Sequence, residues 1–168
     1  LQAPRTPRTV VLDSVMADIN YAIDHLPEVK TVNEISRWTA LALKSRICLF
    51  EGTFRKYHTE FKLPEYEAFL DNAIAASKEL IERSGYKLYN TGHPESDYLN
   101  LFASLNANED EIILARAFSD ELQVYHNLNY YTMTASYGRP GLEKRLVNSY
   151  LMRDGSRFTD IAGYDKME

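Results

Sequence analysis

The sequence predicts a mainly α-helical fold of tetratricopeptide-like helix hairpins with irregular loops, and it leaves room for one short strand pair. Three observations lead to this prediction. The first half of the chain has three long stretches in which apolar residues recur every three or four positions, as on one face of a helix. Small residues within these stretches would let neighbouring helices approach closely. Connectors of modest length join the stretches, which favours antiparallel hairpins, although no clean repeat of about 34 residues can be aligned.

The first predicted helix lies in RTVVLDSVMADINYAIDHLPEV, residues 8–29. Thr9 is a candidate N-cap, and Pro27 is expected to end the helix because proline cannot continue it. The spacing places seven apolar residues on one buried stripe. These are Leu12, Val15, Met16, Ile19, Ala22, Ile23 and Leu26.

The second predicted helix lies in WTALALKSRICLFEGTFRKYH, residues 38–58, after a polar connector. Asn33 or Ser36 can cap it. The lone tryptophan, Trp38, is expected to pack in the interior rather than to stack on a sugar. Cys48 is the only cysteine of the chain, so it cannot form an intramolecular disulfide, and we expect it to be a small buried apolar residue.

The third predicted helix lies in PEYEAFLDNAIAASKELIERSGYKLY, residues 64–89. Pro64 is expected to open the helix, and Ser84-Gly85 is a C-terminal signal with the glycine in the left-handed conformation. Seven residues form its stripe. These are Tyr66, Phe69, Leu70, Ala73, Ala76, Ser77 and Leu80.

The remainder of the chain is expected to be richer in loops. Residues 98–102 suggest a short amphipathic turn, and the run Ile112–Leu114 has the β-propensity of a short strand. The segment SDELQVYHNLNYYTMTASYGRPG, residues 119–141, reads as an ordered, irregular surface segment. A last short helix is expected through Leu142, Val147 and Leu151, with a turn at Asp154-Gly155. We therefore divide a single fold, residues 1–168, into a helical scaffold (1–89) and a loop-rich region (90–168).

Composition and motifs exclude several classes of function. The formal charge is −5 and no long Lys/Arg run occurs, so no nucleic-acid partner is expected. No apolar stretch reaches 18 residues, so no membrane span is expected. The spacing of Cys, His and acidic residues matches no zinc, EF-hand or HExxH pattern, so we expect neither metal nor cofactor. The carboxylates Glu109, Asp110 and Glu111 are expected to form a solvated turn, because adjacent residues do not poise the pair that a glycosidase needs.

Five blocks of the sequence, in this order and at this spacing, resemble the SusD/RagB-like family. The resemblance covers nearly the whole chain, as an internal fragment of a longer family member. The blocks are RTVVLDSVMADINYAIDHLP, RWTALALKSRICLFEGTFRKYH, FLDNAIAASKELIERSGYKLY, DYLNLFASLNANEDEIILAR and LVNSYLMRDGSRF.

This resemblance implies a function that composition does not reveal. Members of the family are nutrient-binding lipoproteins on the outer-membrane surface of Bacteroidetes, with tetratricopeptide-like helix pairs as a scaffold. They bind glycans of starch or other polysaccharide type, or peptides, and pass them to a SusC-like TonB-dependent transporter. They are not enzymes. By this resemblance we expect residues 90–168 to be the ligand side, and any lipid anchor to lie outside the sequence considered.

The segment VYHNLNYYTMTASYGRP, residues 124–140, is the best candidate for the ligand site. Sugar capture needs flat apolar faces with hydroxyl and amide groups beside them, and tyrosine supplies both at a low entropic cost. The candidate ligand-binding residues are Tyr125, Asn127, Asn129, Tyr130, Tyr131, Tyr137 and Arg139. Two alternatives stay open. The tyrosines could instead pack the loop onto the helices, or the chain could be a helical-repeat module that binds a protein or peptide and no sugar. Exposed aromatic residues on a loop would favour a glycan, whereas a groove lined by helix residues would favour a peptide.

Overall fold

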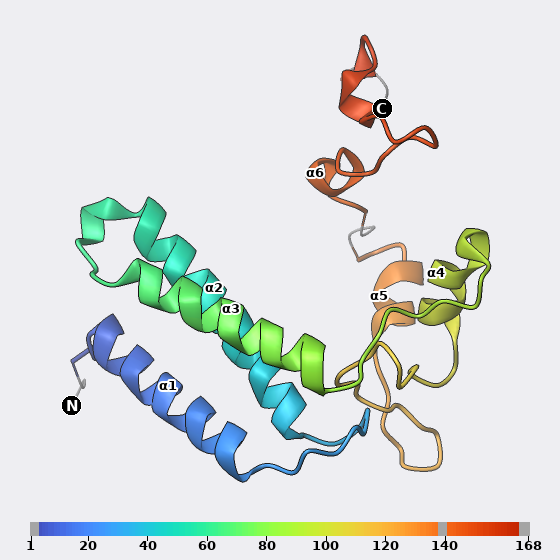
Figure 1. The fold of residues 1–168 in the computed structure, drawn as a ribbon. Helices are drawn as coiled ribbons and strands as arrows, with labels where there is room; N and C mark the ends of the chain where they lie inside the picture. The colour runs from blue at the N-terminus through green and yellow to red at the C-terminus, as the bar shows by residue number, and fades with distance from the viewer. Residues whose placement is uncertain (1–3, 138–140, 165–168) are drawn as a thin grey trace. The chain divides into compact units, whose positions relative to one another are not determined.

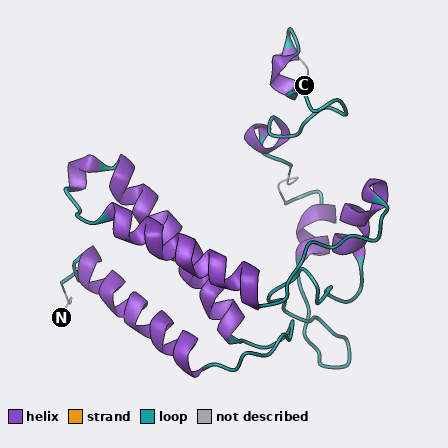
Figure 2. Ribbon diagram, in the orientation of Figure 1, coloured by secondary structure: helices purple, strands orange, loops and turns teal. Residues whose placement is uncertain are grey.

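The computed structural model describes residues 4–137 and 141–164, and the fold within them is mainly helical, as predicted (Figures 1 and 2). The chain forms two compact units, Leu1–Ala117 and Phe118–Glu168. Residues 90–117 therefore belong to the same unit as the long helices. None of the helices in the described part is long and apolar enough to cross a membrane.

Three long helices make up most of the first unit. They are α1 (Arg8–His25), α2 (Arg37–Tyr57) and α3 (Tyr66–Arg83), with a single 3-10 turn, Thr59–Phe61, between α2 and α3. α2 packs against both α1 and α3, and successive helices run in opposite directions (Figure 1). The predicted antiparallel hairpins are therefore confirmed.

The helix ends follow the sequence signals, with two exceptions. The prediction that Pro64 opens the third helix was wrong, because α3 begins at Tyr66, after Glu65 in the left-handed conformation. Ser36, one of two candidates, is the N-cap of α2, and its backbone N–H donates to Thr39 Oγ1 (3.3 Å). Gly85 has a φ of +76°, which confirms the left-handed position after α3. The prediction of Thr9 as N-cap was wrong: α1 begins at Arg8, because Pro7 already provides the first helical carbonyl, which accepts from Val11 N (3.2 Å).

The core lies where the three predicted stripes meet. Trp38 is almost fully buried, and Cys48 is inaccessible to solvent, so both packing predictions are confirmed. Small residues allow α2 and α3 to approach, as expected: Ser45 Oγ lies 2.6 Å from Ser77 Oγ. The central cluster consists of Ile19, Ile23, Trp38, Ala40, Leu41 and Ala76.

A buried group of charges lies in the C-terminal half of α2, and the sequence did not predict it. The Glu51 carboxylate is almost inaccessible and accepts hydrogen bonds from Arg8 and, at 2.8 Å, from Arg55 Nε. Arg55 also donates to the carbonyl of Pro64 (2.6 Å) and lies over the ring of Phe69, 4.4 Å from its centroid. Burial by itself would raise the pKa of Glu51, but the hydrogen bonds from the two arginines outweigh it and hold that pKa below its ordinary value.

The prediction of a strand at Ile112–Leu114 was wrong. The run has no regular secondary structure, and the described residues contain only two isolated β-bridges, Ser119–Val124 and Leu151–Arg157. The backbone after the run bonds instead to the connector before α2, where Ala115 N donates to the carbonyl of Val32 (2.7 Å). A β-propensity run forms a strand only if a partner strand is beside it.

Shorter elements complete the two units. The amphipathic turn near Tyr98 is a helix, α4 (Pro94–Ala103), in the first unit. The second unit contains α5 (Leu128–Met133), α6 (Lys144–Val147) and a 3-10 turn, Phe158–Asp160. The last predicted helix is thus a single turn, because its apolar side chains at 142, 146 and 151 are exposed and short helices depend on tertiary packing. The segment predicted as irregular, in contrast, contains α5.

Candidate functional site

Three of the candidate tyrosines form one exposed cluster, which we call the tyrosine trio: Tyr130, Tyr131 and Tyr137. Their ring centroids lie 5.2–5.6 Å apart, and Tyr131 meets each of the other two edge to face. Each side chain remains 41–55% exposed, so the rings contact one another without being covered. Such edge-to-face pairs stabilise one another by about 0.5–1.5 kcal/mol.

The backbone around α5 explains why these rings meet. Tyr130 and Tyr131 are neighbours on α5, and the chain then turns back, with Thr134 N bonded to the carbonyl of Tyr130 (3.2 Å) and Tyr137 N bonded to that of Thr134 (3.1 Å). The Tyr130 hydroxyl donates to the Tyr137 hydroxyl (3.3 Å). This bond raises the pKa of Tyr130 above its ordinary value, because it stabilises the neutral hydroxyl that donates it.

The fourth tyrosine, Tyr125, lies in a separate hollow of the same unit, with a volume of about 330 Å³. The bridge between Ser119 and Val124 shapes one wall of this hollow. Asn129, from α5, lines it as well. The hollow and the tyrosine trio thus share α5, but no ring contact joins Tyr125 to the trio among the described residues.

The two remaining candidates have other positions. Asn127 is the N-cap residue of α5, and its carbonyl accepts from Tyr131 N (3.1 Å), so its backbone supports the helix that carries the trio. Arg139 lies outside the described residues. Sequence reasoning missed Phe118 and His126, whose rings meet edge to face at 5.0 Å in the hollow. His126 belongs to the tyrosine-rich segment and was within reach of the sequence reasoning, whereas Phe118 lies just before that segment.

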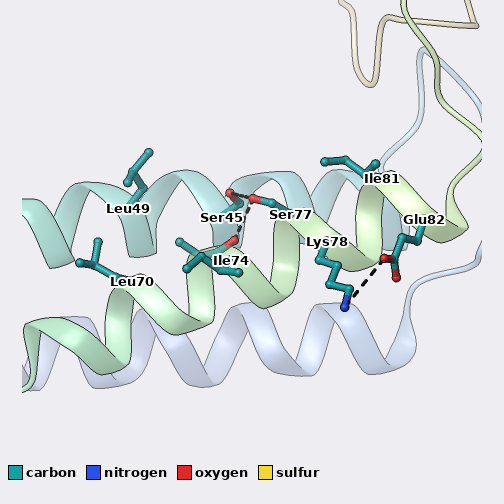
Figure 3. Close-up of a pocket in the computed structure, with 9 residues that line it drawn as sticks. Ser45, Leu49, Leu70, Ile74, Ser77, Lys78, Ile81 and Glu82 are labelled. Atoms are coloured by element: carbon teal, nitrogen blue, oxygen red, sulfur yellow. Dashed lines mark hydrogen bonds and ion pairs between the residues drawn. The ribbon is translucent and has the colours of Figure 1, made fainter.

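A second concave surface, the α2–α3 groove, lies on the helices of the first unit and has a volume of about 560 Å³. Figure 3 shows Leu49 and Leu70 toward one end and Ile81 and Glu82 toward the other, with the Ser45–Ser77 hydrogen bond between them. The groove is apolar apart from these serines and the Lys78–Glu82 ion pair (3.9 Å), and none of its lining residues is aromatic. Ile74 and Ile81 are largely exposed. Their position outside the buried stripe of α3 was the sequence signal for this groove.

The acidic residues at 109–111 form a structural turn. Asp110 pairs with Lys30 and Lys87 (3.5 Å each), and Glu111 accepts a hydrogen bond from Tyr89 N (2.6 Å). The carboxylates of Asp110 and Glu111 therefore connect this turn to Lys87 and Tyr89, which follow α3. No group of three or more potential ligand side chains in the described ranges is placed to hold a metal ion.

The tyrosine trio and the hollow at Tyr125 offer aromatic faces, hydroxyls and an amide, a chemistry suited to reversible binding. No family model, curated protein or solved structure matches this chain.

Proposed function

We propose that this chain is part of a SusD/RagB-like surface nutrient-binding protein, and that the tyrosine trio binds a glycan of starch or another polysaccharide type. The single observation that supports the proposal most is the exposed, pre-assembled cluster of three tyrosine rings. Rings held by one another lose little freedom on binding, so their faces are available for sugar rings at a low entropic cost. The hydroxyls of Tyr130 and Tyr137 lie beside those faces and can exchange hydrogen bonds with sugar hydroxyls.

The rest of the proposal concerns the whole protein and rests on the sequence resemblance. The protein would be attached to the outer-membrane surface by a lipid anchor outside this sequence. It would deliver glycan to a SusC-like TonB-dependent transporter, and it would act as a binding protein rather than an enzyme. A shallow, exposed site of this kind predicts dissociation constants between about 1 μM and 1 mM.

Calorimetry of the chain against soluble starch, xylan, mannan and a β-1,3-glucan tests the site. We expect one of these to bind, and we expect Tyr130→Ala, Tyr131→Ala and Tyr137→Ala each to weaken that binding. Tyr125→Ala tests the neighbouring hollow in the same way. Tyr150→Ala is the matched control, because Tyr150 is an exposed tyrosine of the same unit that contacts none of the trio rings.

Two results would count against the proposal. If a glycan binds and no variant of the trio weakens it, the trio is not the site. If none of the four polysaccharides binds the chain, glycan binding by this chain is refuted.

The α2–α3 groove favours a second candidate function, a helical-repeat module that binds a peptide. A groove between two helices, lined by exposed aliphatic side chains, fits the apolar face of an amphipathic helix. Fluorescence anisotropy with a labelled Leu-rich amphipathic peptide tests this function. Binding that is lost in Ile81→Asp and retained in the trio variants would favour it over the glycan proposal.

A further inference from the structure

A further concave site, which we call the α4 pocket, lies in the first compact unit and is lined by residues of α4 and of the segment 88–92. Its volume is about 600 Å³, against about 330 Å³ for the hollow at Tyr125, and it falls within the roughly 300–1,000 Å³ typical of ligand pockets. Leu88 and Asn90 line it from the segment before α4, and Tyr98 and Phe102 line it from α4. Every residue of the pocket belongs to the first unit.

Hydrogen bonds hold the frame of the α4 pocket. Thr91 donates to the buried Asp97 carboxylate twice, from its backbone N (3.0 Å) and from its hydroxyl (2.5 Å). Gly92 N donates to the side-chain oxygen of Asn90 (2.7 Å), and the positive φ of Gly92 (+87°) turns the chain there. The loop is therefore fixed to the start of α4 before any ligand binds, which lowers the entropic cost of binding.

The aromatic wall of the pocket is built by spacing on α4. Tyr98 and Phe102 are four residues apart, so they lie on one face of the helix, and their ring centroids are 4.8 Å apart. Beneath them Leu101 is buried, whereas Tyr98 and Phe102 are 71% and 63% exposed. Two aromatic rings are thus presented to solvent on a fixed frame.

The polar groups of the pocket indicate the class of ligand. Glu111, Asn90 and Tyr98 all line the pocket, and none of its lining residues is Lys or Arg. Without a cation, the pocket does not suit a phosphate or a carboxylate ligand. Aromatic faces beside carboxylate, amide and hydroxyl groups match the apolar faces and hydroxyls of a neutral sugar.

We propose that the α4 pocket is a second saccharide subsite, which binds a neutral sugar unit between the ring pair Tyr98–Phe102 and the polar groups of Asn90 and Glu111. This inference rests on the proposed function for its ligand class but uses none of the residues of the tyrosine trio. The two sites lie in different compact units, and each is tested by itself.

Nuclear magnetic resonance of the isotope-labelled 168-residue chain distinguishes the two sites residue by residue. The probes are maltohexaose, xylohexaose, mannohexaose and laminarihexaose, titrated to millimolar concentration. We expect one probe to give saturable shifts at the amides of Thr91, Gly92, Tyr98 and Phe102. This measurement uses the unaltered chain, so it does not depend on whether a variant folds.

Tyr98→Ala then tests the ring pair, with Leu99→Ala as the matched control. Both side chains are exposed on α4, but only Tyr98 lines the pocket. Loss of a stacking face predicts about tenfold weaker binding at the pocket for Tyr98→Ala and less than about twofold for Leu99→Ala. Equal effects of the two variants would overturn the subsite.

The outcomes separate this inference from the proposed function. Shifts confined to the tyrosine trio would overturn the α4 subsite and leave the proposed function standing. Shifts at the α4 pocket alone would support the subsite and refute the trio as the site. No shift at either place, with any probe, would overturn both, and the exposed rings of α4 would then be a surface for packing.

Discussion

Glu51→Gln is expected to destabilise the first compact unit by about 3 kcal/mol, because it removes the carboxylate that pairs with the buried Arg55. The side chains of Glu51 and Arg55 are 2% and 5% exposed. Removing one partner of a buried ion pair typically costs about 3–5 kcal/mol, since the remaining charge stays buried without compensation. Glutamine keeps the shape and one acceptor oxygen, and Arg55 keeps its bond to Pro64, so the lower end of this range applies.

The other arginine of the group should contribute less. Arg8 is 43% exposed and can be hydrated when its partner is lost, so Arg8→Gln is expected to cost about 1 kcal/mol or less. The matched control is Glu82→Gln, which removes a carboxylate paired at 3.9 Å with Lys78 on the surface of α3. That change should cost less than about 0.5 kcal/mol.

The effect of Glu51→Gln should depend on pH in a defined direction. The pKa of Glu51 in the folded chain lies below its ordinary value near 4.5, so its stabilising effect is complete above that pH and is lost as the pH falls through the folded-state pKa. The difference in unfolding free energy between the wild type and Glu51→Gln is therefore expected to be constant from pH 7 to about pH 5 and to shrink at lower pH.

Urea unfolding, followed by the fluorescence of the buried Trp38 and by circular dichroism, measures these differences. Trp38 is the only tryptophan, so its signal reports the core of the three long helices. A cost for Glu51→Gln below about 1 kcal/mol, equal to that of Glu82→Gln, would refute the assignment of a buried charge group. A difference that grows as the pH falls below 4.5 would refute the sign of the pKa shift.

Two further predictions concern glycines. Gly52→Ala is expected to destabilise the α2–α3 pair by about 1 kcal/mol, since the new Cβ would lie 2.7 Å from Leu70 Cδ2 and overpacking outweighs the gain in helix propensity. In thermal unfolding the cost should shrink in a Leu70→Ala background, and an equal cost in both backgrounds would contradict the steric cause. Gly85→Ala is expected to cost about 1–2 kcal/mol by denaturant titration, because its φ of +76° strains any residue with a Cβ. The new Cβ would meet no other atom, so backbone strain is the whole of the expected cost. Gly141→Ala, where φ is not positive and the space is also open, should be nearly neutral, and an equal loss at both positions would exclude backbone strain as the reason.

Local patterns were sufficient to predict the three long helices of the first unit. The stripe around Ile19 and Ile23, the cap at Ser36 and the left-handed Gly85 all depend on residues within a few positions, so they can be read from the sequence. The burial of Trp38 followed from the same periodicity. The prediction of a strand at Ile112–Leu114 was wrong because a strand needs a partner strand, which local sequence does not reveal. Here the following residue, Ala115, bonds to the connector at Val32 instead.

The candidate site shows the same division. The sequence shows that residues 124–137 are rich in tyrosine. It does not show the turn at Thr134, which brings Tyr137 to Tyr130 while Tyr125 stays apart from both. The α4 pocket was not predicted at all. It depends on the bond between Tyr89 and Glu111, 22 positions apart, and on the clasp between Thr91 and Asp97.

The sequence by itself determined the helical class, the three amphipathic stripes and the residue types available for binding, because these follow from periodicity and composition. Only the tertiary structure decided which of those residues meet. The burial of Glu51 between Arg8 and Arg55, the clustering of three tyrosines and the aromatic wall of the α4 pocket arise from contacts between side chains that each have several possible partners. Packing selects among those partners, because all the groups must fit the same space at once.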